Sequence, residues 1–341
     1  MQQRIMRLVL VALLLAAVPM NAACQVTNPT SAQSAYAWTK LTDAADFPKS
    51  YNFPVFVSGK KMYAFLGYGV WVSDDGRSWS KTQLEPIRKD VYSTQYVQFR
   101  DAVYAIGNNR GNYEQMTFGS MVRRTDDFQT WKTVAERTNL PGRIFPSFVA
   151  FRDKIWLIGG YDGTRFYNDV WNSSDGVTWN KIVENTDWTP RASSSVAVFN
   201  DKLWLLGGGV IDGMQDPHPN SKREIWSSVD GKKWERVTAE MPTMAGGTPV
   251  VFDNELWLVG ANRDGTFGRS SMVTRDFKTW REEAAPWTPR GAVAAWVFDN
   301  KLFMTGGKYS VTENGEIRFI YSNDVWVMTK AKGAQNDSSR N

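Results

Sequence analysis

Residues 191–238 read RASSSVAVFNDKLWLLGGGVIDGMQDPHPNSKREIWSSVDGKKWERVT, the clearest copy of a unit that the chain repeats six times. Four β-like segments lie in this copy, at 193–199, 202–207, 224–228 and 233–237. Asn200-Asp201 joins the first two segments and Asp230-Gly231 joins the last two, which are tight-turn sequences, while a long polar loop joins the second and third. Six such units predict a ring of four-stranded sheets.

Two columns of residues align the copies. The second segment ends in a glycine in every copy: Gly67, Gly107, Gly159, Gly207, Gly260 and Gly306. The fourth segment is marked by tryptophan in five copies: Trp79, Trp131, Trp179, Trp234 and Trp280. A Ser or Thr, one residue and an Asp precede each of these tryptophans, as in Ser173-Ser174-Asp175-Gly176. We expect the Asp carboxylate to accept backbone N–H groups across the turn and the tryptophan to pack over it.

The last copy lacks its fourth segment, and the missing strand lies at the other end of the chain. Residues 37–41 read AWTKL, the form of a fourth segment, yet no first three segments precede them. Placing the strand around Trp38 beside 323–328 completes the sixth sheet and removes the open edges of a broken ring. The sequence therefore predicts an all-β, six-bladed propeller over residues 36–330, with four antiparallel strands per blade, closed by its N-terminal strand.

The repeat resembles the kelch repeat over roughly residues 37–330. The resemblance rests on glycine doublets such as Gly159-Gly160, on the trailing tryptophan, and on an acidic residue before Val/Ile-Trp, at Asp169, Glu224 and Asp324. The Ser-x-Asp turns also resemble the Asp-box hairpins of sialidase blades. Kelch-like propellers include sugar enzymes, oxidases and pure binders, so the resemblance implies a scaffold rather than an activity.

The first residues predict export. Arg4 and Arg7, an apolar run at 8–18 and small residues through Ala23 have the three-part pattern of a signal peptide, which we place at 1–23. Cys24 follows Ala22-Ala23, which resembles a bacterial lipobox, although Asn21 stands where leucine is usual. Acylation of Cys24 and simple cleavage both remain open, so the protein is expected in the periplasm, on the outer membrane as a lipoprotein, or outside the cell. Residues 24–35 are predicted to be a polar tether and 331–341 a disordered tail.

Composition excludes several classes of function. The formal net charge of +5 becomes +3 once Arg4 and Arg7 are removed, and without a Lys/Arg tract this excess does not indicate nucleic acid binding. Cys24 is the only cysteine and His218 the only histidine, so we expect no disulfide, no metal site of the galactose-oxidase kind and no cofactor. Contact with a membrane is expected only through a lipid on Cys24.

Any ligand site is predicted on one particular face of the ring. Because adjacent strands are antiparallel, the one-to-two and three-to-four turns share a face, which we name the turn face. The two-to-three loops and the crossovers between blades share the opposite face, named the loop face. Its loops at 107–121, 208–225 and 307–325 are long, variable and polar, as recognition loops are.

The crossovers carry a recurrent proline followed directly, or after one residue, by a cation. The cations are Lys49, Arg88, Arg143, Arg191 and Arg290. One interpretation sets these cations around the mouth of the central channel, where they would suit a carboxylate, sulfate or phosphate ligand. The other is structural, because kelch-like repeats often carry an arginine here that bonds neighbouring loop carbonyls.

Further candidates lie on the same face. Trp188 and Trp287 either stack on a sugar ring or cap the gap between blades. His218 with Tyr161, Tyr167 or Arg191 could serve a lyase or epimerase, although His218 lies between prolines in a solvated loop. The three Asp-Gly pairs are read either as paired acid and base carboxylates or as tight turns: Asp162-Gly163, Asp212-Gly213 and Asp264-Gly265.

The first function that these features favour is a non-catalytic, exported or lipid-anchored propeller that binds a glycan or a protein, possibly an anionic one, on the loop face. The alternative is a sugar-processing enzyme that resembles the periplasmic kelch-type sialic acid epimerases in blade number, export and length. A sialidase or lyase is a further version of that alternative. Arg143-Ile144-Phe145-Pro146 departs from the Phe-Arg-Ile-Pro segment expected of sialidases, and no catalytic residue is transferred from either family.

Overall fold

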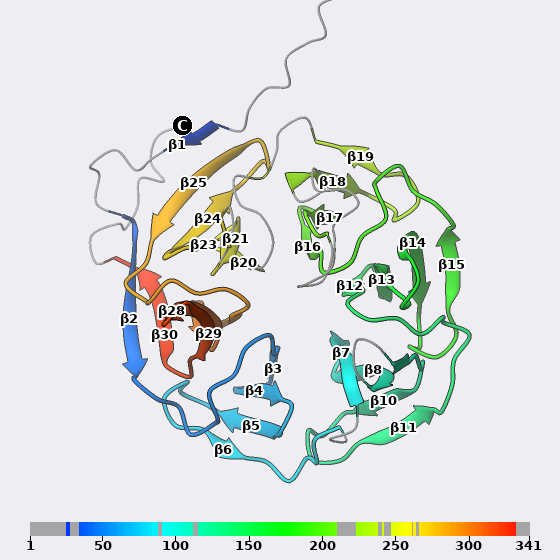
Figure 1. Ribbon diagram of the computed structural model, residues 1–341, viewed down its shortest axis with the longest axis horizontal. Helices are drawn as coiled ribbons and strands as arrows, with labels where there is room; N and C mark the ends of the chain where they lie inside the picture. Colours follow the sequence, from blue (N-terminus) through cyan, green and yellow to red (C-terminus); the bar gives the residue numbers. More distant parts are fainter. Residues whose placement is uncertain are drawn as a thin grey trace, which may run out of the picture.

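The chain folds into a closed ring of six sheets (Figure 1). The computed structural model describes residues 25–27, 34–87, 91–111, 115–209, 223–237, 241, 247–260, 262–263 and 266–331. The all-β, six-bladed architecture is the one that the sequence predicts. The predicted signal peptide, Cys24, and nearly all of the predicted tail lie outside the described residues.

The first three blades follow one another along the chain, each with its strands in sequence order from the channel to the rim. Blade 1 consists of β3 (Val55–Ser58), β4 (Lys61–Leu66), β5 (Gly69–Ser73) and β6 (Ser80–Lys81). Blade 2 consists of β7 (Val91–Phe99), β8 (Ala102–Gly111), β10 (Val122–Thr125) and β11 (Lys132–Ala135), with β9 (Met116–Thr117) paired to β8. Blade 3 consists of β12 (Ser147–Phe151), β13 (Lys154–Tyr161), β14 (Phe166–Ser173) and β15 (Asn180–Val183).

Blades 4 to 6 complete the ring, and the loops of blades 5 and 6 contain additional strand pairs. Blade 4 consists of β16 (Ser195–Phe199), β17 (Lys202–Leu206), β18 (Ile225–Ser228) and β19 (Glu235–Arg236). Blade 5 consists of β20 (Thr248–Phe252), β21 (Glu255–Val259), β24 (Ser270–Thr274) and β25 (Thr279–Ala284), with the short pair β22 (Asn262–Arg263) and β23 (Thr266–Phe267) in its loop. Blade 6 consists of β26 (Ala294–Phe298), β27 (Lys301–Thr305), β30 (Val325–Lys330) and β2 (Tyr36–Thr42), with the hairpin β28 (Lys308–Glu313) and β29 (Glu316–Tyr321) in its loop.

The ring is closed as predicted, by strand β2 at the rim of blade 6. β2 pairs antiparallel with β30, so that Trp38 lies opposite Met328 and Lys40 opposite Trp326. Polar side chains beside β2 also bind blade 5: Ser34 donates to Glu283 at 2.8 Å, and the Tyr36 hydroxyl donates to Asp253 at 2.6 Å. The N-terminal strand therefore joins two blades.

A fifth strand extends blade 5 at its outer edge. β1 (Gln25–Thr27) pairs with β25 in parallel, and Gln25 lies opposite Thr279. Figure 1 shows β1 outside β25 on the rim of the ring. Residues 25–27, part of the predicted polar tether at 24–35, pair with the outer edge of β25, which accepts an added strand.

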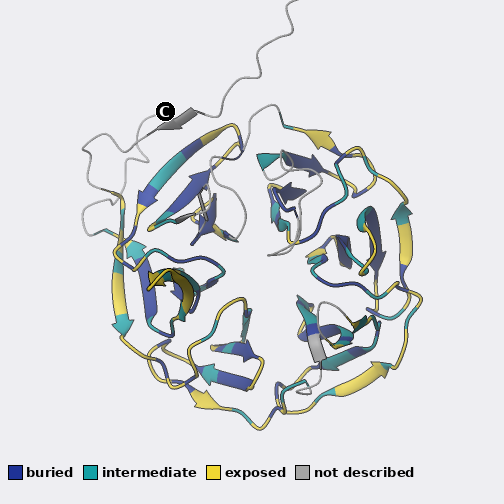
Figure 2. Ribbon diagram, viewed as in Figure 1, coloured by how far each residue is buried: buried dark blue, intermediate teal, exposed yellow. Residues whose placement is uncertain are grey.

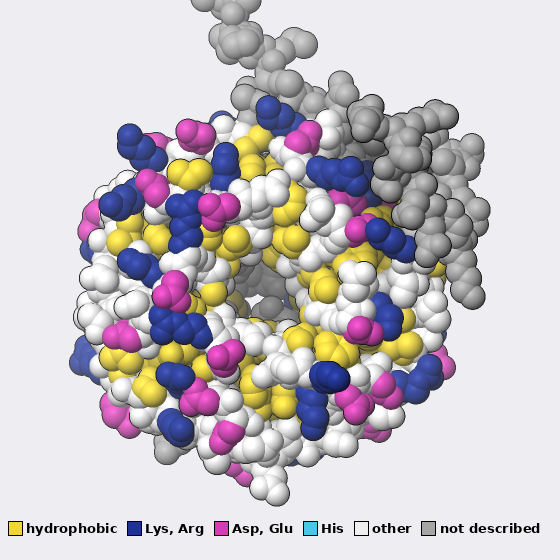
Figure 3. Space-filling view, turned by 180° about the vertical axis from the view of Figure 1, so that it is seen from behind, with side chains coloured by type: hydrophobic (Ala, Val, Ile, Leu, Met, Phe, Trp, Pro, Cys, Tyr) yellow, Lys and Arg dark blue, Asp and Glu magenta, His cyan; other side chains and the backbone are white. Residues whose placement is uncertain are grey.

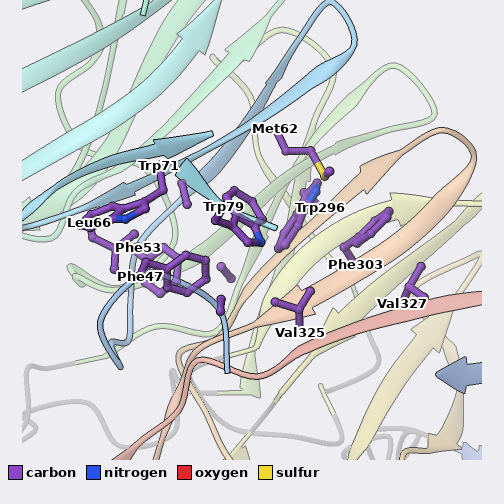
Figure 4. Close-up of a cluster of buried hydrophobic side chains, with 13 residues drawn as sticks. Phe47, Phe53, Met62, Leu66, Trp71, Trp79, Trp296, Phe303, Val325 and Val327 are labelled. Carbon is purple, nitrogen blue, oxygen red and sulfur yellow. The ribbon is translucent and has the colours of Figure 1, made fainter. Parts of the chain in front are cut away.

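The core lies between the blades rather than at the centre of the ring, where an opening is visible (Figures 2 and 3). Second strands such as β13 are buried over almost their whole length, because blades cover both of their faces. Between blades 6 and 1, Phe47, Trp79, Trp296 and Phe303 belong to one buried cluster (Figure 4).

Side chains within the three-to-four turns accept hydrogen bonds from the backbone of the same turn. In blade 3, Asp175 accepts from the N–H groups of Val177 and Thr178, both at 2.8 Å, and Ser173 accepts from Gly176 N. The same carboxylate bonds occur at the other four turns, centred on Asp75, Asp127, Asp230 and Asp276. The hydrogen bonds expected across these turns are therefore present.

The residue after each turn aspartate covers an aromatic ring of the preceding blade. In blades 1, 3 and 4 this residue is a glycine with positive φ, and a Cβ on Gly231 would lie 2.1 Å from the Trp156 ring. In blades 2 and 5 it is phenylalanine, also at positive φ: Phe128 stacks on Tyr63 at 4.0 Å and Phe277 on Trp204 at 3.4 Å between centroids. The turns are thus part of the packing between blades.

Candidate functional site

Three of the predicted arginines are components of the scaffold. Each arginine donates to the carbonyl of the glycine that ends the second segment of the repeat. It also pairs with the acidic residue two positions before the tryptophan of the third strand. The three sets are Arg143 with Gly159 and Asp169, Arg191 with Gly207 and Glu224, and Arg290 with Gly306 and Asp324. The arginine side chains are only 1%, 1% and 3% exposed.

The tryptophan after each acidic residue completes the cluster. Trp171 Nε1 donates to Asp169 at 2.7 Å, and Trp326 Nε1 donates to Asp324 at 2.8 Å. The glycine is required at this point: a Cβ on Gly159, which has φ of 63°, would lie 2.6 Å from the Arg191 carbonyl oxygen. One arginine, one carboxylate, one indole and one carbonyl are therefore joined by hydrogen bonds inside each of these blades.

This geometry favours the structural interpretation of Arg143, Arg191 and Arg290. Their guanidinium groups are directed back into their own blades, where the carboxylates neutralise them, so they do not form the cationic rim that would receive an anion. Lys49 is exposed in the crossover before β3. Arg88 and His218 lie outside the described residues.

The two candidate tryptophans are also buried. Trp188 and Trp287 are each 1% exposed. Trp188 packs edge-on to Trp234, and Trp287 packs edge-on to Trp38 with 4.5 Å between ring centroids. Their rings fill the gaps between structural elements, as in the second of the two interpretations, and neither presents a face to a sugar.

The candidate tyrosines lie at the loop-face ends of β13 and β14, beside the turn that joins these two strands. Tyr161 is half-buried, and its hydroxyl donates to the Gly163 carbonyl at 2.7 Å. Tyr167 donates to Asp162, and the Arg143 guanidinium lies 4.0 Å from its ring centroid. Both hydroxyls are therefore engaged within the protein.

Asp162 is held as an ionised turn residue. Burial opposes its ionisation, but hydrogen bonds from Tyr167, Arg165 and Thr164 outweigh burial and lower its pKa to about 2. A carboxyl group with such a low pKa is a poor general base or acid near neutral pH. This favours the tight-turn interpretation of Asp162-Gly163, while Asp212-Gly213 and Asp264-Gly265 lie outside the described residues.

An exposed apolar surface in the described part of the loop face was not located by the sequence analysis. Hairpin β28–β29 stands in front of blade 6 in the view of Figure 1. Its register places Lys308 opposite Tyr321, Ser310 opposite Phe319 and Thr312 opposite Ile317. Because side chains alternate along a strand, these six residues share one face of the hairpin.

Three apolar side chains form a row along that face and are exposed to an increasing degree toward its tip. Tyr321 is 37% exposed, Phe319 48% and Ile317 69%. At the base of the row Tyr51, from the crossover before β3, is 41% exposed and stacks on Tyr321 with 5.2 Å between centroids. We name these four residues the hairpin patch.

A cation completes the surroundings of the hairpin patch. Lys308 Nζ lies 4.9 Å from the Tyr51 ring centroid and 4.8 Å from that of Phe319. The patch thus combines aromatic rings, an aliphatic tip and a positive charge, with the hydroxyls of Ser310 and Thr312 alongside. Asn314-Gly315 between two alternating segments was the sequence signal for this hairpin, and both residues have positive φ as a type I′ turn requires.

A hollow on the loop face lies between blades 2 and 3. Its volume is about 520 Å³, and its lining includes Asn108, Phe118, Glu136, Arg137 and Thr138. Glu136 and Arg137 are exposed at its border. The hollow offers polar groups of both signs and one aromatic ring, without the enclosed apolar wall typical of a small-molecule pocket.

Metal-binding clusters and membrane-spanning helices are both absent from the described part of the chain. Within these residues no group of three or more His, Cys, Asp or Glu side chains could hold a metal ion. In the same part of the chain there is no helix of the length and apolarity needed to cross a bilayer.

The family model described as DUF6242 beta propeller domain matches residues 18–332. No curated protein matches the chain.

Proposed function

Because the chain belongs to the DUF6242 β-propeller family, a family described by its fold, we propose a function from the geometry: it is a non-catalytic binding propeller. The partner is a protein or a glycan, and it binds on the loop face at the hairpin patch. We further propose that the protein is exported and anchored through Cys24, and that its blades are kelch-like with Asp-box-like turns.

The observation that carries this proposal is the exposure of the hairpin patch. Ile317, Phe319 and Tyr321 have 69%, 48% and 37% of their surface in solvent although they are adjacent on one face. Contiguous exposed apolar side chains on a soluble protein mark interaction surfaces more often than single ones do. Burying such a row would stabilise a complex by about 25 cal/mol for each Å² of apolar surface removed from water.

The chemistry of the patch favours a protein partner. Tyr and Phe are frequent at the centres of protein interfaces, and a lysine beside them adds charge complementarity to an acidic partner. The Ile317 side chain at the tip has no ring to stack on a sugar. Tyr51, Phe319 and Tyr321 alone would suit a saccharide, so a glycan is the second occupant to test.

The alternative, a sugar-processing enzyme, has less support among the described residues. Arg143, Arg191 and Arg290 already bind carboxylate and carbonyl groups of the protein. Asp162 stays ionised because of the hydrogen bonds that it accepts. A free arginine beside a tyrosine and a titrating carboxylate would have favoured that alternative.

The proposal is tested with the full-length chain, expressed in the native cells, and its double variant Ile317→Ser/Phe319→Ser. Val134→Ser/Val229→Ser is the matched control, since Val134 and Val229 are 40% and 49% exposed on other blades. We expect crosslinking in the native cells to recover a partner with the parent and control proteins and to lose it with the hairpin variant. Glycan arrays probed with the same three proteins would reveal a saccharide ligand instead.

Two results would contradict the proposal. Partner recovery that is equal for the hairpin variant and the control would show that the hairpin patch is not the contact surface. Turnover of sialic acids or acidic oligosaccharides by the purified protein, followed by NMR, would establish the enzyme alternative.

A further inference from the structure

The hydrogen bonds at the base of hairpin β28–β29 show which of its backbone groups point outward. Lys308 donates to the Gly291 carbonyl at 2.9 Å and accepts from Gly291 N at 3.0 Å, so its backbone groups face away from β29. Ser322 instead donates to the Gly307 carbonyl at 3.1 Å, across the hairpin. In an antiparallel pair these two directions alternate along each strand, and residues opposite each other share the same direction.

This alternation places outward backbone groups at the residues of the hairpin patch. Tyr321 lies opposite Lys308, so the N–H and C=O groups of Tyr321, Phe319 and Ile317 all face away from β28. β28 and β29 form a sheet of two strands by themselves. Within the described part of the chain, nothing accepts from or donates to the backbone groups of Ile317 and Phe319.

The turn of the hairpin requires the same register. Asn314 and Gly315 have φ of 53° and 82° and form a two-residue turn between Glu313 and Glu316. In a type I′ hairpin the two residues that flank the turn are hydrogen-bonded to each other. Counting from Glu316, the next residue, Ile317, faces outward, as the base of the hairpin also indicates.

We propose that the partner binds as an extended polypeptide segment, which adds a third strand to the outer edge of β29. The inference rests on the proposed function, because it takes the hairpin patch as the contact surface, and it commits to a protein segment instead of a glycan. An exposed strand edge is a template for pairing with another chain. Main-chain hydrogen bonds would supply affinity, and contacts with the Ile317 and Phe319 side chains would supply specificity.

Other open edges of the protein offer less apolar surface to an added strand. β29 has three exposed large apolar side chains, whereas the outer strands β2, β6, β11, β15 and β19 together have one, Val134. The edge of the outer strand of blade 5, β25, already carries β1. On β28 the outward groups above the base belong to Ser310 and Thr312, whose hydroxyl side chains add no apolar contact.

The charges of the hairpin predict the composition of the partner segment. Both of its glutamates lie on the face opposite the patch, where Glu313 pairs with Arg318 at 2.6 Å. On the patch face Lys308 is the one charged side chain of the hairpin. We therefore expect the segment to have apolar residues at alternate positions, beside Ile317 and Phe319, and an acidic residue toward the base of the hairpin.

A second copy of this chain would fit the edge poorly. If two β29 strands paired antiparallel about Phe319, Gly315 of one hairpin would lie opposite Asn323 of the other. Asn323 is 8% exposed, and its side chain donates to the carbonyls of Ala45 and Phe47. The loop face would thus obstruct the tip of a second hairpin, whereas a short extended segment can end where the edge ends.

The probe for the test comes from a phage-displayed library of random linear peptides. The full-length parent protein captures the phage, and peptides that the double variant Ile317→Ser/Phe319→Ser also retains are removed. We expect the remaining peptides to alternate apolar and polar residues and to contain Asp or Glu. A synthetic peptide of one selected sequence is then used in the two measurements that follow.

Amide hydrogen exchange distinguishes strand addition from contact through side chains alone. Labelling the full-length protein with ¹⁵N-isoleucine reports on two neighbouring positions of β29. The N–H of Ile317 faces outward, whereas that of Ile320 faces Tyr309 across the hairpin. The peptide should slow exchange at Ile317 about tenfold or more, and should slow it less at Ile320.

A proline substitution isolates the outward N–H group. Ile317→Pro and Ile317→Ser both remove the apolar side chain, but only proline also removes the N–H. Thr312 lies directly opposite Ile317, so Thr312→Pro is the matched control, with the same ring at the same level on the other edge. Ile317→Pro should bind the peptide about tenfold more weakly than Ile317→Ser does, and Thr312→Pro should bind within about twofold of the parent.

The outcomes separate this inference from the proposed function. Equal affinities of Ile317→Pro and Ile317→Ser, unchanged exchange at Ile317, or an equal loss in Thr312→Pro overturn strand addition at β29 and leave the hairpin patch as a contact surface. The same holds if no peptide distinguishes the parent from the double variant, or if the ligand of the patch is a saccharide. Partner recovery that does not depend on the hairpin patch overturns both proposals.

Discussion

Phe277 provides a test of how the blades are joined. It is fully buried, stacks on Trp204 with 3.4 Å between ring centroids and 6° between ring planes, and has a φ of 59°. Phe277→Ala removes the ring and should destabilise the protein by about 3–5 kcal/mol. The alanine keeps a Cβ in a left-handed conformation, which costs about 1–2 kcal/mol for an L residue.

Phe277→Gly should therefore be the more stable of the two variants, by about 1 kcal/mol. At an ordinary position the order is the reverse, because glycine loses more backbone entropy on folding. Phe252 provides that control: it is 4% exposed at the end of β20 and does not have a positive φ. Phe252→Gly should be about 0.5–1 kcal/mol less stable than Phe252→Ala.

The assay is urea unfolding of the four variants, followed by tryptophan fluorescence. Their free energies of unfolding are compared provided that the variants have the same m-value. An inversion of the Gly–Ala order at position 277 relative to position 252 is the expected result. If glycine is the worse residue at both positions, left-handed strain does not limit the turn, and stacking alone explains why phenylalanine is tolerated there.

Three further results are expected. Arg290→Met leaves Asp324 largely buried without its cation and should cost about 3–5 kcal/mol in urea unfolding, and adding Asp324→Leu should recover most of this loss. Asp175 is partly buried, which opposes ionisation, but backbone N–H bonds outweigh burial and lower its pKa. The stability that ionised Asp175 contributes is therefore fully present above the ordinary aspartate pKa of about 4, and it is lost as the pH falls through the lower pKa of the folded protein. The urea concentration at the midpoint of unfolding should decrease below about pH 4. This decrease should be smaller in Asp175→Asn. A chain that begins at residue 43 lacks β2 and should lose cooperative unfolding and aggregate in size-exclusion chromatography, whereas one that begins at residue 34 should behave as the parent does.

The sequence predicted the architecture because the residues that define its repeat determine where strands end and where the chain turns. The glycine and tryptophan columns specify where strands end and turn, and the orphan strand around Trp38 specifies how the ring closes. These features are local, or depend on pairing alone, so they can be read without knowing the side-chain packing.

The site was less predictable because it depends on side-chain direction. The crossover pattern placed Arg143, Arg191 and Arg290 on the correct loops, but the pattern is the same whether a guanidinium faces the channel or bonds a glycine carbonyl of its own blade. The acidic residues at Asp169, Glu224 and Asp324 were visible in the repeat, and pairing them with the arginines would have favoured burial.

Two elements were missed for different reasons. The Asn314-Gly315 turn was a clear hairpin signal within a segment that was treated only as a long polar loop. β1 could not be predicted from its composition, since three residues carry too little periodicity and its pairing is with a rim strand more than 250 positions away.

Ring closure by β2 also has a consequence for the order of events during biosynthesis. β2 is among the first parts of the propeller to be translated, and its partner β30 is among the last. The first five blades can assemble as they appear, but the sixth has no outer strand until both ends of the polypeptide meet. A chain that ends before Val325 would contain β2 without the strand that pairs with it.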